Sequence, residues 1–319
     1  MTDGRAGALA DSGRPRIAIL PRPVQWAVDA VVAGGGLPVD PSSSPEAVVC
    51  TEIMGPYVEE VRRILATQQD VEWVQLPMAG VERIFQAGLI DRGRRWTSAK
   101  GAYADPVAEH ALALALAGLR HLPARVRATS WGAPSGTSLY DQPVTIVGGG
   151  GITRSLLTLL APLRTDVTVV RLHPDPVEGA ARTVGLEELH AALGTALVVV
   201  LTLALTPHSR QIFGRAELAA MRHDAWLVNV ARGGLVDTDA LVDALEGGTI
   251  GGAALDVTDP EPLPAEHPLW GLENCIITPH TADTQEMIAP LLAHRITENV
   301  RRFANGDELV GLVDLDLGY

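Results

Sequence analysis

The chain has 319 residues, of which 47% are hydrophobic and 20% charged, and it contains 32 glycines. This composition is typical of a globular α/β protein and excludes a disordered or fibrous chain. The formal charge of −13 disfavours nucleic acids and anionic lipid surfaces as partners. Lys100, the only lysine, has no phosphate-loop motif around it.

A chain of this length usually forms two domains, because a single core stops growing at about 250–300 residues. Residues 1–14 carry scattered charges and no apolar segment, so we expect a loose tail and no signal peptide. Cys50 and Cys275 form no metal or redox motif, and so few cysteines indicate a reducing compartment. The longest apolar runs are too short to span a membrane. We therefore expect a cytoplasmic protein without a metal site.

Short apolar strands alternate with helical patterns in the first third of the chain. Strands are expected at 16–20, 46–50 and 71–76. With an amphipathic helix at 57–69, this order is typical of βαβ units and a parallel sheet. The stretch "DPVAEHALALALAGLRHLP" (105–123) predicts one long helix that begins at Asp105 and Pro106. It is apolar almost all round, so we expect it to be buried.

A second βαβ series follows the polar, Gly- and Ser-rich stretch at 130–142. Strands are expected at 143–148, 166–172, 196–205, 224–230, 250–257 and 275–278. This number of strands suits a doubly wound, nucleotide-binding sheet. The last long pattern, 284–306, predicts a helix that ends at Asn305 and Gly306.

The stretch "TIVGGGGITRSLL" (145–157) leads from a strand through four glycines into a helix. Gly148 and Gly150 match the dinucleotide-binding fingerprint, whereas Thr153 replaces its third glycine. We expect the N–H groups of this turn and of the helix start at Gly151 and Ile152 to hold a pyrophosphate. The Cβ atom of Thr153 is expected to hold the helix slightly away from the strand. The motif alone also fits a plain strand–helix turn.

The next expected strand ends at Arg171, where the fingerprint places an acidic residue for the ribose 2′-hydroxyl. A guanidinium cannot accept a hydrogen bond from that hydroxyl, but it can bind a 2′-phosphate, and His173 can assist. This substitution favours NADP(H) over NAD(H). The alternative is a solvated arginine at a strand end.

Functional side chains follow three further strands directly. They are Arg232 in "NVARGG", Glu261 after Asp256 in "ALDVTDPEP", and His280 in "TPHTADT". Because the carboxyl ends of parallel strands line the ligand crevice, we expect these residues to meet there. Each has a structural explanation when taken singly: a capped turn, a solvated loop acid and a core histidine. Together they suit the reduction of a carbonyl beside a carboxylate, with Arg232 binding the carboxylate, His280 donating a proton and Glu261 orienting the imidazole.

Four stretches carry a resemblance to a known family: "NVARGGLVDTDALVDAL", "ALDVTDPEPLPAEHPLW", "ITPHTADT" and "ENVRRFANGDELVGLVD". With them the chain resembles the D-isomer-specific 2-hydroxyacid dehydrogenases along nearly its whole length. The resemblance implies an α/β fold in which a doubly wound parallel Rossmann-type sheet is inserted in a discontinuous flavodoxin-like substrate domain. The expected boundaries are 1–104 for the first part of the substrate domain, 105–284 for the dinucleotide-binding domain, and 285–319 for the returning helix and tail.

The resemblance also implies roles for individual residues. Arg232, Glu261 and His280 would form the catalytic set. Asp256 and the backbone near Val230 would hold the nicotinamide amide. The backbone N–H groups of Gly80 and Val81 would form a second anchor for the substrate carboxylate. The apolar helix at 105–121 would make the interface of a homodimer.

These expectations favour an NAD(P)H-dependent oxidoreductase that interconverts a small 2-oxo acid and its D-2-hydroxy acid. Glyoxylate or hydroxypyruvate reduction with NADPH is the leading prediction, with NAD(H) as the other cofactor to consider. The alternative is a nucleotide-sensing, corepressor-like interaction protein on the same fold. The intact set of Arg232, Glu261 and His280 favours the enzyme, whereas Thr153 slightly favours the sensor.

Overall fold

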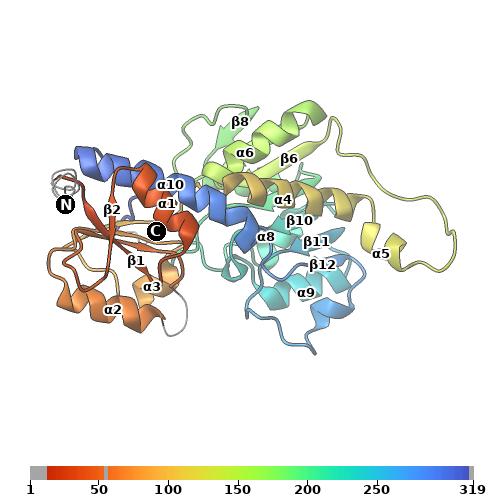
Figure 1. Cartoon of the computed structure of the whole chain (residues 1–319). Coiled ribbons are helices and arrows are strands. Elements are labelled where there is room, and N and C mark those ends of the chain that lie inside the picture. Colours follow the sequence, from red (N-terminus) through yellow and green to blue (C-terminus); the bar gives the residue numbers. More distant parts are fainter. Residues whose placement is uncertain (1–12, 54–56, 316–319) are drawn as a thin grey trace, which may run out of the picture. The chain divides into compact units, whose positions relative to one another are not determined.

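The computed structural model describes residues 13–53 and 57–315 of the chain. It divides into two compact units, the first formed by the chain up to residue 103 together with residues from 285 onward, the second by residues 104–284 (Figure 1). The expected N-terminal tail lies outside the described residues except for residues 13 and 14. Within the described part, no helix has the length and apolarity needed to cross a membrane.

The first unit contains a five-stranded parallel sheet in the order β2-β1-β3-β4-β5, which is the flavodoxin-like order. Its strands are β1 (Arg16–Leu20), β2 (Leu37–Val39), β3 (Ala47–Cys50), β4 (Trp73–Gln75) and β5 (Arg95–Thr97). The expected strands are β1, β3 and β4, whereas the two edge strands were not predicted. Both edge strands have only three residues, and β2 contains Pro38, which a sheet tolerates at its edge.

Helices cover both faces of this sheet. They are α1 (Gln25–Ala33), α2 (Tyr57–Thr67), α3 (Glu82–Gln86) and α10 (Gln285–Asn305). Helix α2 buries Val61, Ile64 and Leu65 in one core cluster, the i, i+3, i+4 spacing that puts apolar side chains on one helix face. Helices α1 and α10 pack together. Helix α10 ends as predicted, with Gly306 at a φ of 74° directly after it.

A buried polar network fixes the C-terminal helix to the first sheet. Asn299 of α10 is fully buried, and its amide nitrogen donates to Gln75 Oε1 at 2.8 Å and to the Val310 carbonyl at 2.9 Å. Its amide oxygen accepts from the Val310 N–H at 2.8 Å. Gln75 Oε1 also accepts from the Thr97 hydroxyl at 2.9 Å. Because every polar atom in such a network needs its partner, α10 has a specific position on this sheet.

The second unit contains a seven-stranded parallel sheet in the order β12-β11-β10-β9-β6-β7-β8. Its strands are β6 (Pro143–Val147), β7 (Asp166–Val170), β8 (Arg182–Val184), β9 (Val198–Leu201), β10 (Trp226–Asn229), β11 (Gly252–Leu255) and β12 (Cys275–Ile277). Strand order reverses between β6 and β9, and a crevice for ligands forms at such a switch point. All the expected strands are present, and β8 is an additional short edge strand. The predicted doubly wound, Rossmann-type sheet is thereby confirmed.

The helices of this unit lie on both faces of its sheet. They are α4 (Ala104–Leu119), α5 (Leu122–Arg127), α6 (Gly151–Leu160), α7 (Leu189–Leu193), α8 (Arg215–Ala220) and α9 (Thr238–Glu246), with short 3₁₀ helices η1 (Ala161–Leu163), η2 (Leu186–Glu188), η3 (Gly233–Leu235) and η4 (Pro268–Gly271). Trp226 of β10 lies under Gly118 of α4. The next residue, Leu227, points the opposite way, into a core shared with α7, α8 and α9.

The long apolar helix expected over 105–123 is present but ends earlier than predicted, and it is not fully buried. Helix α4 ends at Leu119, His121 has a φ of 51°, and α5 begins at Leu122. Pro123 accounts for the break, since proline in a helix interior removes a hydrogen bond and clashes with the preceding turn. One face of α4 is buried, but Leu116 is 37% exposed. After α5 the chain leaves the body of this unit as a long loop (Figure 1).

Candidate functional site

The glycine turn after β6 has the shape of a phosphate-binding turn. Gly148 has a φ of 121°, and a Cβ atom there would lie 2.5 Å from Thr202 Oγ1, so only glycine fits. Gly150 is the N-cap of α6, whose first N–H groups have no partner within the helix. A Cβ atom on Gly150 would meet no described atom within 4 Å. The turn is thus open where a pyrophosphate would approach these N–H groups.

Thr153 strengthens this turn. The residue is fully buried, and its hydroxyl donates to the Gly148 carbonyl at 2.8 Å. The same hydroxyl lies 2.9 Å from Thr202 Oγ1, in the segment that follows β9. The extra side chain that replaces the third glycine of the fingerprint therefore links the turn to the neighbouring strand end.

Arg171 borders the glycine turn. It directly follows β7, and a Cβ atom on Gly149 would lie 2.9 Å from its Cδ atom and 3.0 Å from its Nε atom. The guanidinium group is thus next to the proposed pyrophosphate-binding turn. His173, two residues further on, is exposed.

The turn that presents Arg232 is fixed by the last residue of β10. Asn229 is buried, its side-chain oxygen accepts from the Ala231 N–H at 3.1 Å, and its amide nitrogen donates to the Arg232 carbonyl at 2.9 Å. The Arg232 guanidinium donates to the Ala231 carbonyl at 2.7 Å. Val230, between these residues, is buried beside the same turn. The "NVAR" sequence thus sets the direction in which the half-buried Arg232 side chain leaves the sheet.

Gly233 brings this turn against the loop that leads to Glu261. A Cβ atom on Gly233 would overlap the carbonyl group of Thr258. Any side chain at this position would therefore separate the Arg232 turn from the loop that follows β11.

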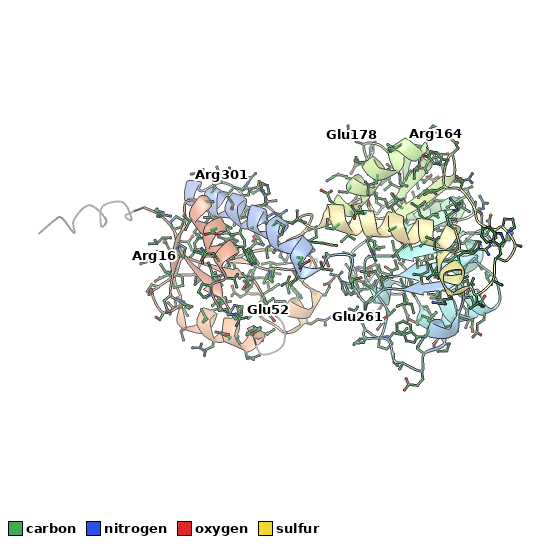
Figure 2. All side chains as sticks on the ribbon, turned by 45° about the vertical axis from the view of Figure 1, so that its right-hand side comes forward. Arg16, Glu52, Arg164, Glu178, Glu261 and Arg301 are labelled. Atoms are coloured by element: carbon green, nitrogen blue, oxygen red, sulfur yellow. The ribbon has the colours of Figure 1, made fainter. Side chains whose placement is uncertain are left out.

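His280 and Glu261 form a close pair. His280 Nδ1 lies 2.6 Å from Glu261 Oε1, and the two side chains are 43% and 30% exposed, so a ligand can reach the pair. The backbone of His280 has a φ of 52°, a conformation rare for residues other than glycine. Its N–H donates to the Asp256 carbonyl at 2.9 Å, which helps to hold this conformation. Figure 2 shows Glu261 well apart from Arg164, the residue shortly before β7 in the same unit.

Asp256 anchors the loop that carries His280. Its buried carboxylate accepts from the Thr278 hydroxyl at 2.6 Å and from the Thr281 N–H at 2.9 Å through Oδ1, and from the Ala282 N–H at 3.1 Å through Oδ2. The carboxylate therefore holds the loop at residues before and after His280.

The same contacts explain the acidity of Asp256. Burial raises its pKa, but the hydrogen bonds from His110, Thr278 and two backbone N–H groups outweigh burial and bring the pKa from 3.8 to about 2. Asp256 therefore stays ionised at any pH at which the protein would be assayed.

Sequence reasoning missed His110, Thr278 and Asp283. The pKa of Asp283 is raised, chiefly by burial; the charge of Asp256 adds to the rise, while those of His280 and Arg232 oppose it. Asp283 is thus in the electrostatic neighbourhood of both His280 and Arg232. The position of Asp283, three residues after His280, could have indicated this from the sequence. His110 stands in a helix far away along the chain, so no local pattern linked it to this loop.

The expected substrate anchor, Gly80 and Val81, belongs to the first unit. These residues lie between β4 and α3, and the Val81 carbonyl accepts from the Phe85 N–H at 2.8 Å. Val81 is buried and Gly80 is half-buried.

Comparisons with known proteins identify the family of this chain. A family model described as D-isomer specific 2-hydroxyacid dehydrogenase, NAD binding domain, matches residues 110–282. An uncharacterized protein in the proB 3′ region of Corynebacterium melassecola is 42% identical over 79% of this chain and 84% of its own length. The mouse glyoxylate reductase/hydroxypyruvate reductase is 30% identical over 72% of this chain and 74% of its own.

A solved structure is similar over almost the whole chain. It is a D-isomer specific 2-hydroxyacid dehydrogenase from Xanthobacter autotrophicus Py2 in complex with NADPH and MES, 27% identical, with a TM-score of 0.81 over 96% of this chain and 100% of the other. The chain therefore belongs to the D-isomer specific 2-hydroxyacid dehydrogenase family, an oxidoreductase family, and its second unit contains the NAD-binding domain of that family.

Proposed function

We propose that this protein reduces a small 2-oxo acid to its D-2-hydroxy acid with a reduced nicotinamide cofactor, and catalyses the reverse reaction. The observation that carries the proposal is the pair of His280 and Glu261, 2.6 Å apart. It stands on the same sheet, at the same strand ends, as the Arg232 turn and the open glycine turn.

Each side chain of the set has a distinct task. The planar guanidinium of Arg232 binds the substrate carboxylate and polarises the adjacent carbonyl. When bound, the cofactor supplies a hydride to the carbonyl carbon. His280 donates its Nε2 proton to the carbonyl oxygen and becomes neutral. Glu261 hydrogen-bonds to Nδ1 of the same ring and so orients the imidazole for the transfer.

The cofactor would be held by the residues that the sequence indicated. Backbone N–H groups would bind the pyrophosphate at Gly148, Gly150, Gly151 and Ile152. The nicotinamide amide would be held by the Val230 backbone and by Asp256. The Oδ2 atom of Asp256 accepts one hydrogen bond, from Ala282, so it has capacity for one further donor.

NADPH is the proposed cofactor because Arg171 borders the glycine turn and can bind a 2′-phosphate through its fork of N–H donors. His173 would assist from the exposed segment behind it. The related Xanthobacter enzyme was solved with NADPH, which supports the same preference. NAD(H) is the alternative.

Glyoxylate and hydroxypyruvate are the proposed substrates, with Gly80 and Val81 as second anchor for the carboxylate. Support comes from the mouse relative, which is named for both activities. Thr153 no longer favours the alternative of a nucleotide-sensing, corepressor-like protein, since its hydroxyl closes the glycine turn without filling its open side. The cytoplasmic location stays a prediction.

A screen of small 2-oxo acids against NADPH and NADH tests the function. We expect glyoxylate and hydroxypyruvate to oxidise NADPH, which is measured as a loss of the absorbance of the reduced nicotinamide. Oxidation of NADH should be slower. Replacing Arg171 with Asp removes the 2′-phosphate partner and supplies an acceptor for the ribose hydroxyls. This variant should therefore lose roughly 10- to 100-fold in kcat/KM for NADPH, the effect of one or two lost charge-assisted hydrogen bonds, while it keeps or gains activity with NADH.

Two results would contradict these proposals separately. A preference of the unaltered protein for NADH would refute the role of Arg171 alone. Tight binding of both cofactors without turnover of any 2-oxo acid would favour the sensor over the enzyme.

We further propose that the protein is a homodimer whose interface is formed by the apolar helix at 105–121 and by residues 122–139 after it, here called the arm. Trp131 in this arm is 98% exposed and Val126 is 83% exposed. Large apolar side chains in such positions are typical of surfaces that a partner covers, and a second copy would bury both arms in one symmetric interface. The double variant Val126→Glu and Trp131→Ser should sediment as a monomer where the unaltered protein sediments as a dimer. A monomeric unaltered protein would refute this proposal.

A further inference from the structure

His110 contacts the loop of the proposed proton donor from a distant part of the chain. It lies near the middle of α4, and its side chain is 23% exposed. Its Nε2 atom is 3.0 Å from the Thr278 hydroxyl and 3.3 Å from Asp256 Oδ1. These two partners are the side chains that close the loop around His280.

The hydrogen bonds of Thr278 indicate which ring nitrogen of His110 carries a proton. The threonine hydroxyl has a single proton, which it donates to Asp256 Oδ1 at 2.6 Å. It can therefore only accept from the imidazole, so His110 carries a proton on Nε2. The result is a directed chain of hydrogen bonds from His110 through the Thr278 hydroxyl to the Asp256 carboxylate.

This chain ends on the atoms that hold the backbone of His280. Asp256 receives the N–H groups of Thr281 and Ala282 through its carboxylate and the N–H of His280 through its carbonyl oxygen. His280 is in the left-handed backbone region, which needs support from its surroundings. If Thr278 and Asp256 lost their donor in α4, the Thr278 hydroxyl would lose one partner, and the carboxylate would be held only by its contacts within the loop. The loop of His280 would then be less firmly fixed.

We propose that His110 is a positioning residue, which fixes the loop of His280 through Thr278 and Asp256 and so aims the imidazole for proton transfer. The proton-transfer step in this inference rests on the proposed function. The contact between His110 and the loop is independent of that function. The effect passes through hydrogen bonds and not through contact with substrate.

Two variants of His110 separate the hydrogen bond from the volume of the side chain. In His110→Met an apolar side chain of similar size replaces the donor, whereas in His110→Gln an amide N–H can occupy the place of Nε2–H. We expect the methionine variant to lose about 10- to 100-fold in kcat, since small displacements of a reacting group have effects of this size. KM for the 2-oxo acid should change less than about threefold, because His110 is not among the residues proposed to bind the substrate. The glutamine variant should recover most of kcat. His223→Met, at an exposed histidine of the same unit, is the matched control.

A spectroscopic readout tests the positioning without any turnover. Two-bond nitrogen–proton correlation spectra of the [¹⁵N]histidine-labelled protein report the tautomer of each imidazole through protons that do not exchange. We expect His110 to carry its proton on Nε2. We also expect the His280 ring signals to shift or broaden in the methionine variant and to return in the glutamine variant. Should His110→Met fail to fold, Thr278→Val removes the same link and should have the same effects.

The outcomes separate this inference from the proposed function. If no 2-oxo acid is reduced but the His280 signals respond to His110→Met, the positioning holds and the function fails. If kcat and the His280 signals are unchanged in His110→Met, or if only the melting temperature falls, His110 has no positioning role and the inference is refuted.

Discussion

Replacing His280 with Asn is expected to lower kcat for 2-oxo acid reduction by about 10²- to 10⁴-fold, the contribution typical of a general acid. The asparagine amide can still hydrogen-bond to Glu261, but it has no proton to transfer to the carbonyl oxygen. Binding of NADPH, measured by fluorescence titration, should stay within about twofold of the unaltered protein, since the ring is not among the groups proposed to hold the cofactor. The loss should therefore appear in kcat and not in cofactor affinity.

The pH profile gives a second test of the same role. Reduction consumes one proton, which His280 is proposed to supply, so kcat/KM of the unaltered protein should fall as pH rises. The residual activity of His280→Asn should not follow this profile. Glu261→Gln keeps a hydrogen-bonding group beside Nδ1 but removes the carboxylate that orients the ring, so kcat/KM should be lower than in the unaltered protein. A flat profile for the unaltered protein would show that another group donates the proton.

Much of the fold followed from patterns that lie within short stretches of sequence. Short apolar runs bounded by turns gave β6, β7 and β9 to β12, because such runs are buried on both faces of a parallel sheet. The edge strands β2, β5 and β8 were missed, since each has three residues and depends on its neighbour for pairing. The break between α4 and α5 was also missed, although Pro123 marked it, because the apolar pattern continues across it.

For the site, the sequence order was informative because a parallel sheet collects its strand ends at one edge. Arg232, Glu261 and His280 lie in the loops that follow β10, β11 and β12, so their approximate location could be predicted. The contacts that fix them could not. His110 reaches the loop of His280 through tertiary packing of α4, and the hydroxyl of Thr153 replaces packing that a glycine would give. Both depend on distances between segments far apart in the chain.

The function of Arg232 depends on geometry as well as on charge, so Arg232→Lys is the most informative substitution at this position. A lysine keeps the positive charge but cannot form two parallel hydrogen bonds to a carboxylate, nor hydrogen-bond the carboxylate and the carbonyl oxygen at fixed angles. We expect kcat/KM for the 2-oxo acid to fall by about 10²- to 10³-fold, which corresponds to roughly 3–4 kcal/mol. Both KM and kcat should change, because Arg232 binds the ground state and also stabilises the charge that develops on the carbonyl oxygen.

Arg215→Lys is the matched control for this substitution, since Arg215 forms an exposed ion pair with Asp243 on the same unit. Its kcat/KM should stay within about twofold, because exposed ion pairs contribute little. Affinity for NADPH should be unchanged in both variants. If Arg232→Lys raised KM alone and left kcat intact, Arg232 would be a binding residue without a part in polarising the carbonyl. If neither constant changed, the substrate carboxylate would have to be bound elsewhere, and the arrangement around His280 would need another explanation. The buried hydrogen bonds of Asn229 hold backbone atoms of the Arg232 turn, which the substitution leaves in place, so a loss of activity reports on the side chain at this position.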